Sequence, residues 1–370
     1  MIKFIVRRIL GLIPLFLGVI VISFVLMQLA PGGPAGQVIN NTRITQEQKE
    51  RWLAKWCLED SKDIGSIIKQ FGGWSGILNC GKEGTDQFFS DQGGLNFLPA
   101  FVGGGDNGFL HLDLGTSIDT GRPVMDMIGE RLPATLMLTT TALILWVTIA
   151  ILAGVYAAIR RYSWFDQGLT LFSYIFYSLP TFWLGLMLIF LFGPFLHILP
   201  TGGVVEVRNW PAFGSPQFWA AAGQRPIEAF LDIGKHLILP VGTLVLVNIA
   251  ADSRFVRASM MEALNQDYVR TARAKGLRDR VVVGKHAFRN ALLPVVTNVG
   301  LELPFLVSGA VVTETIFTWP GLGRLFIESI GERDYYILMA LIMLGSFFVL
   351  VANLLADVVY AVVDPRIRYD

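Results

Sequence analysis

Glu302 is the carboxylate most in need of a chemical explanation, because it interrupts the apolar stretch 291–313. An ionised side chain near the centre of a membrane-spanning helix costs about 3 kcal/mol or more, so such residues face a bundle interior or water. Glu302 is therefore a candidate to line a path for a polar solute, together with Asn298 and Ser178. Alternatively, Glu302 lies at a kink before Pro304 and pairs with a helix of another chain, while Asn298 and Ser178 join neighbouring helices through hydrogen bonds.

Other side chains give little support for catalysis or for a metal. The sequence has no GxxxxGK(S/T) loop to hold nucleotide phosphates, and no HExxH or Ser/His arrangement lies inside an apolar stretch. We therefore predict no catalytic residue, no metal site and no cofactor bound by this chain. The formal net charge of +1 gives no indication of a nucleic-acid partner.

The two cysteines, Cys57 and Cys80, lie in the polar region 31–131. If this region faces an oxidising compartment, a disulfide between them can form; two separately buried thiols are the alternative. The region also contains a capping box with Thr45 as N-cap and Gln48 at the third helical position, followed by Gly- and Asp-rich turns. We expect an external domain that covers the mouth of a path or docks a partner.

Long apolar stretches must position these residues. The chain is 53% hydrophobic and only 16% charged, with a mean hydropathy of +0.54, whereas soluble domains are about 25% charged. A helix needs about 20 apolar residues to cross the hydrocarbon core, and in lipid it must satisfy its own backbone hydrogen bonds. We therefore predict an all-α membrane protein with six transmembrane helices: one within 1–30 and the others at about 132–159, 168–196, 236–257, 291–313 and 335–360.

Basic residues orient these helices. The apolar stretch that follows Lys3, Arg7 and Arg8 is too long for the apolar core of a signal peptide. With the N-terminus in the cytoplasm, 16 of the 30 Lys and Arg residues fall in short cytoplasmic segments, in agreement with the positive-inside rule. Residues 31–131 are then external, 132–362 form the helical core, and both the N-terminus and the tail 363–370 are cytoplasmic.

The cytoplasmic segment before Pro294 is rich in Arg and Lys. Good helix formers extend from Arg257 to Gly276, and a glycine there is typical of a helix C-cap, while Pro294 is expected to open the next apolar helix. We predict a helix–turn–helix on the inner membrane face. On charge alone, an interfacial helix attracted to anionic lipid is the favoured interpretation of the segment.

The amino-acid sequence of this segment resembles that of a known protein family. Arg270-Thr271-Ala272-Arg273-Ala274-Lys275-Gly276 resembles the EAA loop of type I ABC importer permeases, in the form of the dipeptide/oligopeptide/nickel permease family. Ala272 and Gly276 fit the EAA spacing, whereas Arg270 and Thr271 replace its Glu and Ala, and the gap to Pro294 is longer. Other strings resemble the same family in order along the chain: Arg7-Arg8 with Pro31-Gly32-Gly33-Pro34, Asp113-Leu114-Gly115-Thr116-Ser117, Glu130-Arg131-Leu132-Pro133-Ala134-Thr135, Glu314-Thr315-Ile316-Phe317-Thr318-Trp319-Pro320-Gly321-Leu322-Gly323 and Asp364-Pro365-Arg366-Ile367-Arg368-Tyr369.

The resemblance covers nearly the whole chain and implies the B-type permease subunit of an ATP-driven importer in a prokaryotic plasma membrane, with 132–362 as the type I permease core. It implies that ATP and magnesium are used by two cytoplasmic ATPase subunits, and that a second homologous permease, an external solute-binding protein and membrane lipid are the other partners. The residues expected to couple to an ATPase are Tyr268, Arg270, Thr271, Ala272, Lys275, Gly276 and Leu277. Among them, Ala272 is expected to permit close approach of the ATPase.

The sequence leaves the solute open. Peptides are favoured by the resemblance, but relatives also carry nickel chelates, glutathione and oligosaccharides. A proton-coupled secondary transporter is an alternative that would have internal repeats and broken helices meeting at the membrane midplane, and we find no clear repeat. A membrane scaffold without transport activity is the third class considered.

Overall fold

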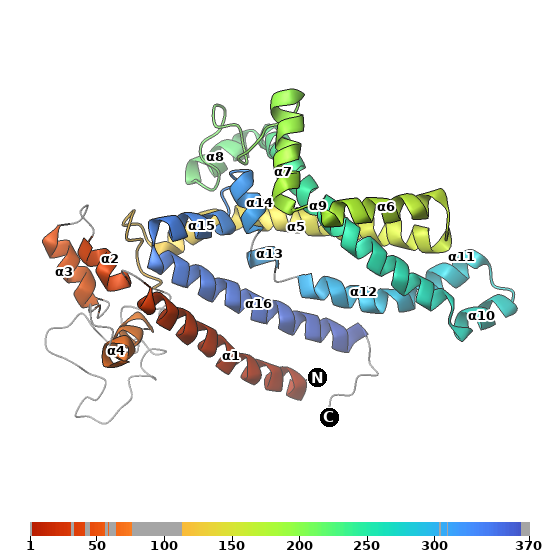
Figure 1. Cartoon of the computed structure of the whole chain (residues 1–370), viewed down its shortest axis with the longest axis horizontal. Coiled ribbons are helices and arrows are strands. Elements are labelled where there is room, and N and C mark those ends of the chain that lie inside the picture. The colour runs from red at the N-terminus through yellow and green to blue at the C-terminus, as the bar shows by residue number, and fades with distance from the viewer. Residues whose placement is uncertain are drawn as a thin grey trace. The chain divides into compact units, whose positions relative to one another are not determined.

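The computed structural model describes residues 2–30, 33–40, 45–55, 58, 64–75, 113–302, 305–308 and 310–363 (Figure 1). Across these ranges the chain is helical with connecting turns and loops; they contain no strand, and an isolated antiparallel bridge joins Thr116 to Pro123. The chain divides into two compact units, one formed by 1–9, 131–325 and 348–370, the other by 10–130 and 326–347. The predicted disulfide between Cys57 and Cys80 lies outside the described residues.

Four helices are long and apolar enough to cross a membrane within the part of the chain that the structure describes. They are α1 (Ile2–Leu29), α5 (Val124–Ile159), α9 (Pro226–Leu264) and α16 (Tyr335–Val363). Each contains one of the predicted apolar stretches, and α5 and α9 begin eight to ten residues before the stretch because the preceding residues also form helix.

The stretch 168–196 was predicted as one helix, and this is wrong. It forms α6 (Trp164–Ser178), α7 (Thr181–Phe190) and the π-helical turn η3 (Leu191–Phe195), with a bend of 100° between the first helix and the rest. Leu179 is extended, at φ −82° and ψ 131°, because the ring of Pro180 disfavours helical geometry in the residue before it.

The stretch 291–313 also differs from a single helix. It lies within α12 (Phe288–Glu302), α13 (Phe305–Ser308) and α14 (Val311–Ile316), preceded by α11 (Asp279–Val281) and the π-helical η4 (Val282–Ala287). Ala310, at φ −89° and ψ 69°, is not helical, so the stretch is interrupted before α14. Pro294, predicted to open the helix, lies inside α12, because the helix already begins at Phe288.

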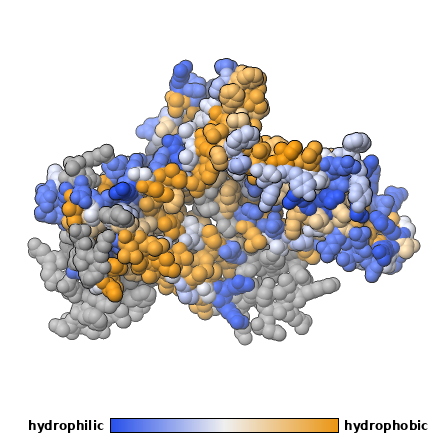
Figure 2. All heavy atoms as spheres, in the orientation of Figure 1, coloured by the Kyte–Doolittle hydropathy of each residue, from blue (hydrophilic) through white to orange (hydrophobic). Residues whose placement is uncertain are grey.

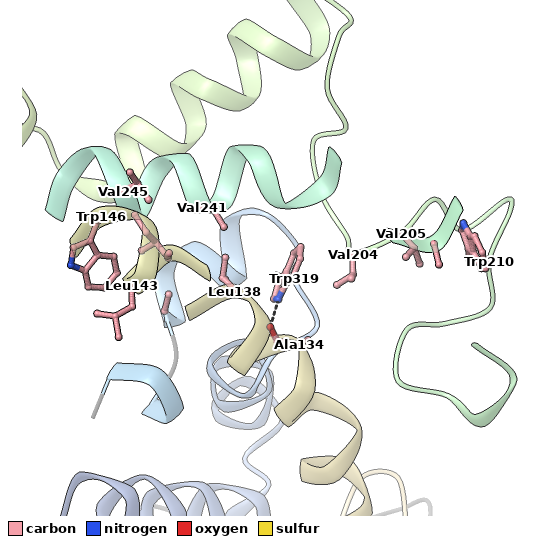
Figure 3. Close-up of a cluster of buried hydrophobic side chains, with 14 of the residues drawn as sticks. Ala134, Leu138, Leu143, Trp146, Val204, Val205, Trp210, Val241, Val245 and Trp319 are labelled. Carbon is pink, nitrogen blue, oxygen red and sulfur yellow. Dashed lines mark hydrogen bonds between the residues drawn. The ribbon is translucent and has the colours of Figure 1, made fainter. Parts of the chain in front are cut away.

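The first unit has a core between α5 and α9. Leu138 and Trp146 of α5 pack with Val241 of α9, and the loop residues Trp319 and Trp210 join them (Figure 3). The chain between η3 and α9 adds a short helix, α8 (Pro216–Gln224), capped by the Ser215 side chain. This core brings the loop after α14 onto the early part of α5.

The described part of the second unit includes the short helices α2 (Pro34–Asn40), α3 (Gln46–Lys55) and α4 (Ile64–Ser75). α3 begins directly after Thr45, as the capping box predicts. Gln28 of α1 donates to Gln70 of α4 at 2.6 Å, and both side chains are buried. Buried Asp334, which accepts from Ser117 at 2.6 Å, precedes α16; burial raises the pKa of its carboxyl group, and the hydrogen bond from Ser117 opposes that rise.

Candidate coupling and pathway sites

The helix α10 (Asp267–Ala274) has one buried and one exposed face. Val269 and Ala272, three residues apart and therefore on one side of the helix, are buried. They belong to an apolar cluster with Ala158 of α5, Met260 and Ala263 of α9, and Val282, Ala287 and Ala291 of η4 and α12. This packing fixes the inner face of α10 to the first unit and leaves its polar face free.

Gly276 ends α10, as the sequence predicts. Its φ of +73° lies in the left-handed region that favours glycine. The Gly276 N–H donates to the Arg273 carbonyl at 2.9 Å, and the Leu277 N–H donates to the Ala272 carbonyl at 3.4 Å. These two bonds form a Schellman motif, which satisfies the last carbonyls of the helix and turns the chain sharply back towards α11.

The exposed surface of α10 and the following turn is polar and mainly basic. Arg270, Thr271, Arg273 and Lys275 are exposed, as are Arg278 and Arg280 after the turn. Figure 2 shows hydrophilic residues gathered over α10 and α11. The two ion pairs here, Arg270–Asp267 and Arg273–Asp279, are each 3.5 Å long and exposed, so they add little stability. The surface is therefore suited to contact a partner rather than to hold the fold together.

Six of the seven predicted coupling residues lie on this exposed surface: Tyr268, Arg270, Thr271, Lys275, Gly276 and Leu277. Ala272 is an exception, because it is only 5% exposed and packs in the apolar cluster of its own chain. The expectation that Ala272 permits close approach of an ATPase is therefore corrected: its small side chain lets α10 pack closely on α9 and η4. The i, i+3 spacing of Val269 and Ala272 could have indicated this.

The pathway candidates lie in two places. Asn298 of α12 donates to the Asp252 carboxylate of α9 at 3.2 Å, and half-buried Glu302 interacts electrostatically with Asp252. Exposed Ser178 donates instead to the carbonyl of Tyr174 in its own helix at 2.7 Å. The structure thus joins Asn298 to Asp252, a residue that the sequence analysis passed over although its carboxylate lies within an apolar helix, and it does not join Ser178 to them.

No group of three or more His, Cys, Asp or Glu side chains that could hold a metal ion occurs within the described ranges. The Asp252 group has two carboxylates and one amide, on α9 and α12. Among the described residues, no Lys, Arg or His forms an ion pair with either carboxylate, in contrast to Asp166, Asp267 and Asp279. Asp252 and Asn298 therefore form a polar contact between two largely apolar helices, α9 and α12.

Glu314 is buried. The sequence analysis named it only as part of the segment 314–323 and gave it no role of its own. Its carboxylate accepts from the Thr135 hydroxyl at 2.9 Å and from the Arg324 N–H at 3.1 Å. Thr135 in turn accepts from the Leu322 N–H at 2.7 Å. Leu322 begins α15 (Leu322–Glu332), so Glu314 and Thr135 satisfy N–H groups of its first turn that have no partner within the helix.

Glu314 is shielded from water on all sides and has 0% exposure. The hydrogen bonds from Thr135 and Arg324 offset part of the cost of burying this carboxyl group. Next to it, the buried Trp319 indole donates to the Ala134 carbonyl at 2.8 Å, as Figure 3 shows. The segments around Thr135 and Glu314 each resemble the permease family and are far apart in the sequence. In the fold they are in direct contact.

The comparisons with known proteins agree with this arrangement. A family described as "Binding-protein-dependent transport system inner membrane component" matches residues 150–369. The chain is 38% identical to the oligopeptide transport system permease protein AppB of Bacillus subtilis, and the alignment covers 100% of both chains. It is 35% identical to the di/tripeptide permease DppB of Pseudomonas aeruginosa and 34% identical to the dipeptide permease DppB of Escherichia coli, each alignment covering 100% of this chain and 99% of the relative.

The three relatives match along the whole chain, and the family match includes the segment that carries α9, α10 and Glu314. They make the chain a transport subunit with several membrane-crossing helices rather than an enzyme. The chain therefore belongs to the inner-membrane permease components of binding-protein-dependent transport systems, in the group that includes these dipeptide and oligopeptide permeases.

Proposed function

We propose that this chain forms half of the translocation pathway of an ATP-driven importer for peptides or similar small solutes. Full-length similarity to permeases named for oligopeptide and dipeptide transport supports peptides as the solute class. The other half is a second, homologous permease subunit. An external binding protein delivers the solute, which makes that protein the main source of selectivity.

The observation that carries the proposal is the geometry of α10. Its apolar face is fixed to α5, α9 and η4, while its polar face is exposed and ends in the Gly276 turn. An exposed helix anchored in this way suits docking in a groove of an ATPase, since force on α10 is transferred to the membrane helices. ATP and magnesium are bound by two such ATPase subunits and not by this chain.

We place α10 in the cytoplasm, with both termini on the same side, in the plasma membrane of a prokaryote. The basic residues support this orientation: Arg270, Arg273 and Lys275 lie in a short segment next to α9. The chain then crosses the membrane six times, with the bent α6–α7 pair as the third crossing and the segment from α12 to α14 as the fifth. Residues 31–131 lie outside, where a bridge between Cys57 and Cys80 is chemically allowed.

The solute path is proposed to pass the Asp252 group. Glu302 and Asn298 are half-buried, and carboxylates inside membrane-crossing segments mark solute or ion paths more often than they mark simple packing. Ser178 also stays a candidate for the solute path. Unlike Glu302 and Asn298 it is exposed, and its position at the bend between α6 and α7 is open to solvent or to the second permease.

The test uses the complete transporter in proteoliposomes, assembled from both permeases, the ATPases and the binding protein. Uptake of a radiolabelled dipeptide should require ATP inside the cytoplasmic compartment and should persist without a proton gradient. Gly276→Trp should abolish uptake and co-purification of the ATPases while leaving membrane insertion intact, because a bulky residue replaces glycine at φ +73° on the docking surface.

Gly223→Trp is the matched control, because Gly223 is an exposed α8 residue with open space around it. It should transport as the wild type does. Uptake that follows a proton gradient without ATP would instead assign the chain to the secondary transporters. Unchanged uptake in Gly276→Trp would remove α10 as the coupling element.

A further inference from the structure

An ion pair between a buried carboxylate and a half-buried guanidinium joins α6 to α9 close to the end of α9. The Arg257 Nε donates to Asp166 Oδ1 at 2.5 Å, and its Nη2 donates to Asp166 Oδ2 at 2.8 Å. The Asp166 side chain is 3% exposed and the Arg257 side chain 26%. Two parallel bonds between a planar guanidinium and a carboxylate fix both the distance and the orientation of the two helices at this point.

Asp166 also holds the turn between α5 and α6. Its Oδ2 accepts from the Tyr162 N–H at 2.8 Å, and its own N–H donates to the Ser163 hydroxyl at 3.3 Å. Tyr162 has a φ of 62°, a conformation that a non-glycine residue keeps only when its surroundings enforce it. One carboxylate therefore ties the strained turn, the start of α6 and Arg257 of α9 together.

The same part of α9 is held on its other side by α5. A Cβ at Gly154 would lie 2.6 Å from the Ser253 carbonyl oxygen and 2.8 Å from the Val256 Cβ, so the two backbones are in direct contact there. The part of α9 from Ser253 to Arg257 thus contacts α5 through its backbone and α6 through Arg257. Other charges near the pair are Arg161, which acts on Asp166, and Arg254, whose guanidinium lies over the Tyr174 and Tyr177 rings.

From Arg257 the path to α10 is short and rigid. Met260 and Ala263, one and two turns further along α9, pack with Val269 and Ala272 of α10 in the apolar cluster. In the other direction α6 leads to the bend at Leu179, and α7 beyond it packs against α9 and α14. Asp166–Arg257 is therefore a charged contact between the helix that carries α10 and the bent α6–α7 pair.

The exposed ion pairs on α10 provide a contrast. They are longer and solvent-exposed, and they lie on the surface proposed to dock the ATPase. A buried pair is a poor source of net stability compared with apolar residues of similar volume, but it defines one geometry, because a carboxylate left without its guanidinium is strongly disfavoured in a buried position. This makes the pair suited to transmit displacement without slipping.

We propose that Asp166 and Arg257 are positioning residues that make α6 follow α10 during transport. Displacement of α10 by the ATPase moves the end of α9, the guanidinium of Arg257 carries Asp166 with it, and the bent α6–α7 pair changes its tilt. The inference rests on the proposed function, since it assigns the step that follows ATPase docking.

The experiment measures assembly, ATP hydrolysis and dipeptide uptake in the complete transporter carrying Asp166→Asn. We expect assembly with the second permease and the ATPases to be retained, ATP hydrolysis to continue, and peptide taken up per ATP hydrolysed to fall about tenfold. Arg257→Lys, which keeps the charge but not the two parallel bonds, should give an intermediate ratio. Glu228→Gln, which breaks the exposed pair with Arg225 at 3.3 Å, should leave the ratio unchanged.

If Asp166→Asn fails to assemble, the double variant Asp166→Leu/Arg257→Met decides, because an apolar pair of similar volume removes the buried charge without exposing a lone one. The proposal expects it to assemble with a lowered ratio, since apolar contacts can slide. A wild-type ratio in Asp166→Asn or in the double variant would overturn the proposal. Absence of ATP-dependent uptake in the wild type would instead contradict the proposed function.

Discussion

Two regions of α5 are fixed to the rest of the first unit, but by different chemistry. At Ala134 and Thr135, the contacts are hydrogen bonds to the loop that carries Trp319 and to the start of α15. About 36 Å further along the helix axis, near Ala158, α5 meets the α9–α10 region through apolar packing, and the turn after α5 meets α9 through the Asp166–Arg257 pair.

The difference teaches which end can move. At the Trp319 end, the contacts reach the backbone itself: Gly203 N–H donates to the Phe317 carbonyl at 2.9 Å, and a Cβ at Gly202 would lie 2.8 Å from the same oxygen. Near Arg257, α5 and α9 are also in backbone contact at Gly154, but Asp166 of α6 meets α9 through the long Arg257 side chain. We infer that the Trp319 end is a rigid frame and the Arg257 end the part that changes during transport.

The largest expected effect tests the rigid frame. Trp319→Ala removes a side chain with 0% exposure and leaves a cavity beside α5, which should lower the free energy of unfolding by about 4 kcal/mol. Trp319→Phe keeps most of the volume and loses the bond to the Ala134 carbonyl, which should cost about 1 kcal/mol. Unfolding of the purified protein in mixed detergent measures both; equal losses would mean that the indole does not fill this core.

The next effect concerns close approach of α5 and α9. Gly154→Ala places a methyl group 2.6 Å from the Ser253 carbonyl oxygen, which should destabilise the protein by about 2 kcal/mol. Gly168→Ala is the matched change in α6, where nothing lies near the new methyl group, and it should stabilise by about 0.5 kcal/mol because alanine is the better helix former. Thermal unfolding should therefore shift in opposite directions, and a common direction would contradict the direct backbone contact.

A smaller effect separates two buried threonines of α5. Thr135 bridges the Leu322 N–H and the Glu314 carboxylate, so Thr135→Val leaves both groups without this partner and should cost about 2 kcal/mol. Thr139 only donates to the Thr135 and Leu306 carbonyls, which have a second lone pair, so Thr139→Val should cost about half as much or less. If the two variants unfold at the same denaturant concentration, Thr135 does not organise the start of α15.

The sequence allowed the long helices and the α10 turn to be predicted, because both depend on local features. Long apolar stretches identify α1, α5 and α16, and Gly276 ends α10 where a left-handed residue is needed. The bend at Leu179 was within reach, since Pro180 follows it directly. In that case the hydrophobicity of the whole stretch outweighed a local signal that turned out to be decisive.

The contacts that join distant residues could not be predicted. Asp166 and Arg257 are 91 residues apart in the sequence, and neither residue shows in its own surroundings which partner it meets. The sequence identified Glu314 only as part of a segment that resembles the family. It did not indicate that the Glu314 carboxylate is buried and accepts a hydrogen bond from Thr135. Ala272 was assigned to the wrong face because the resemblance was read without the apolar periodicity of α10.

The smallest expected effect on stability tests the end that is proposed to move. Gly276→Ala puts a Cβ on a residue at φ +73° with open space around it, so strain alone should cost about 1 kcal/mol. Gly284→Ala, a nearby glycine in η4 with equally open surroundings and no positive φ, is the control and should be neutral or slightly stabilising. Because the strain falls on the turn that follows α10, ATPase binding should weaken in Gly276→Ala while the Trp319 end stays intact. Co-purification of the ATPases together with hydrogen exchange at the start of α15 checks this; loss of protection at α15 would show that the two ends are not separable.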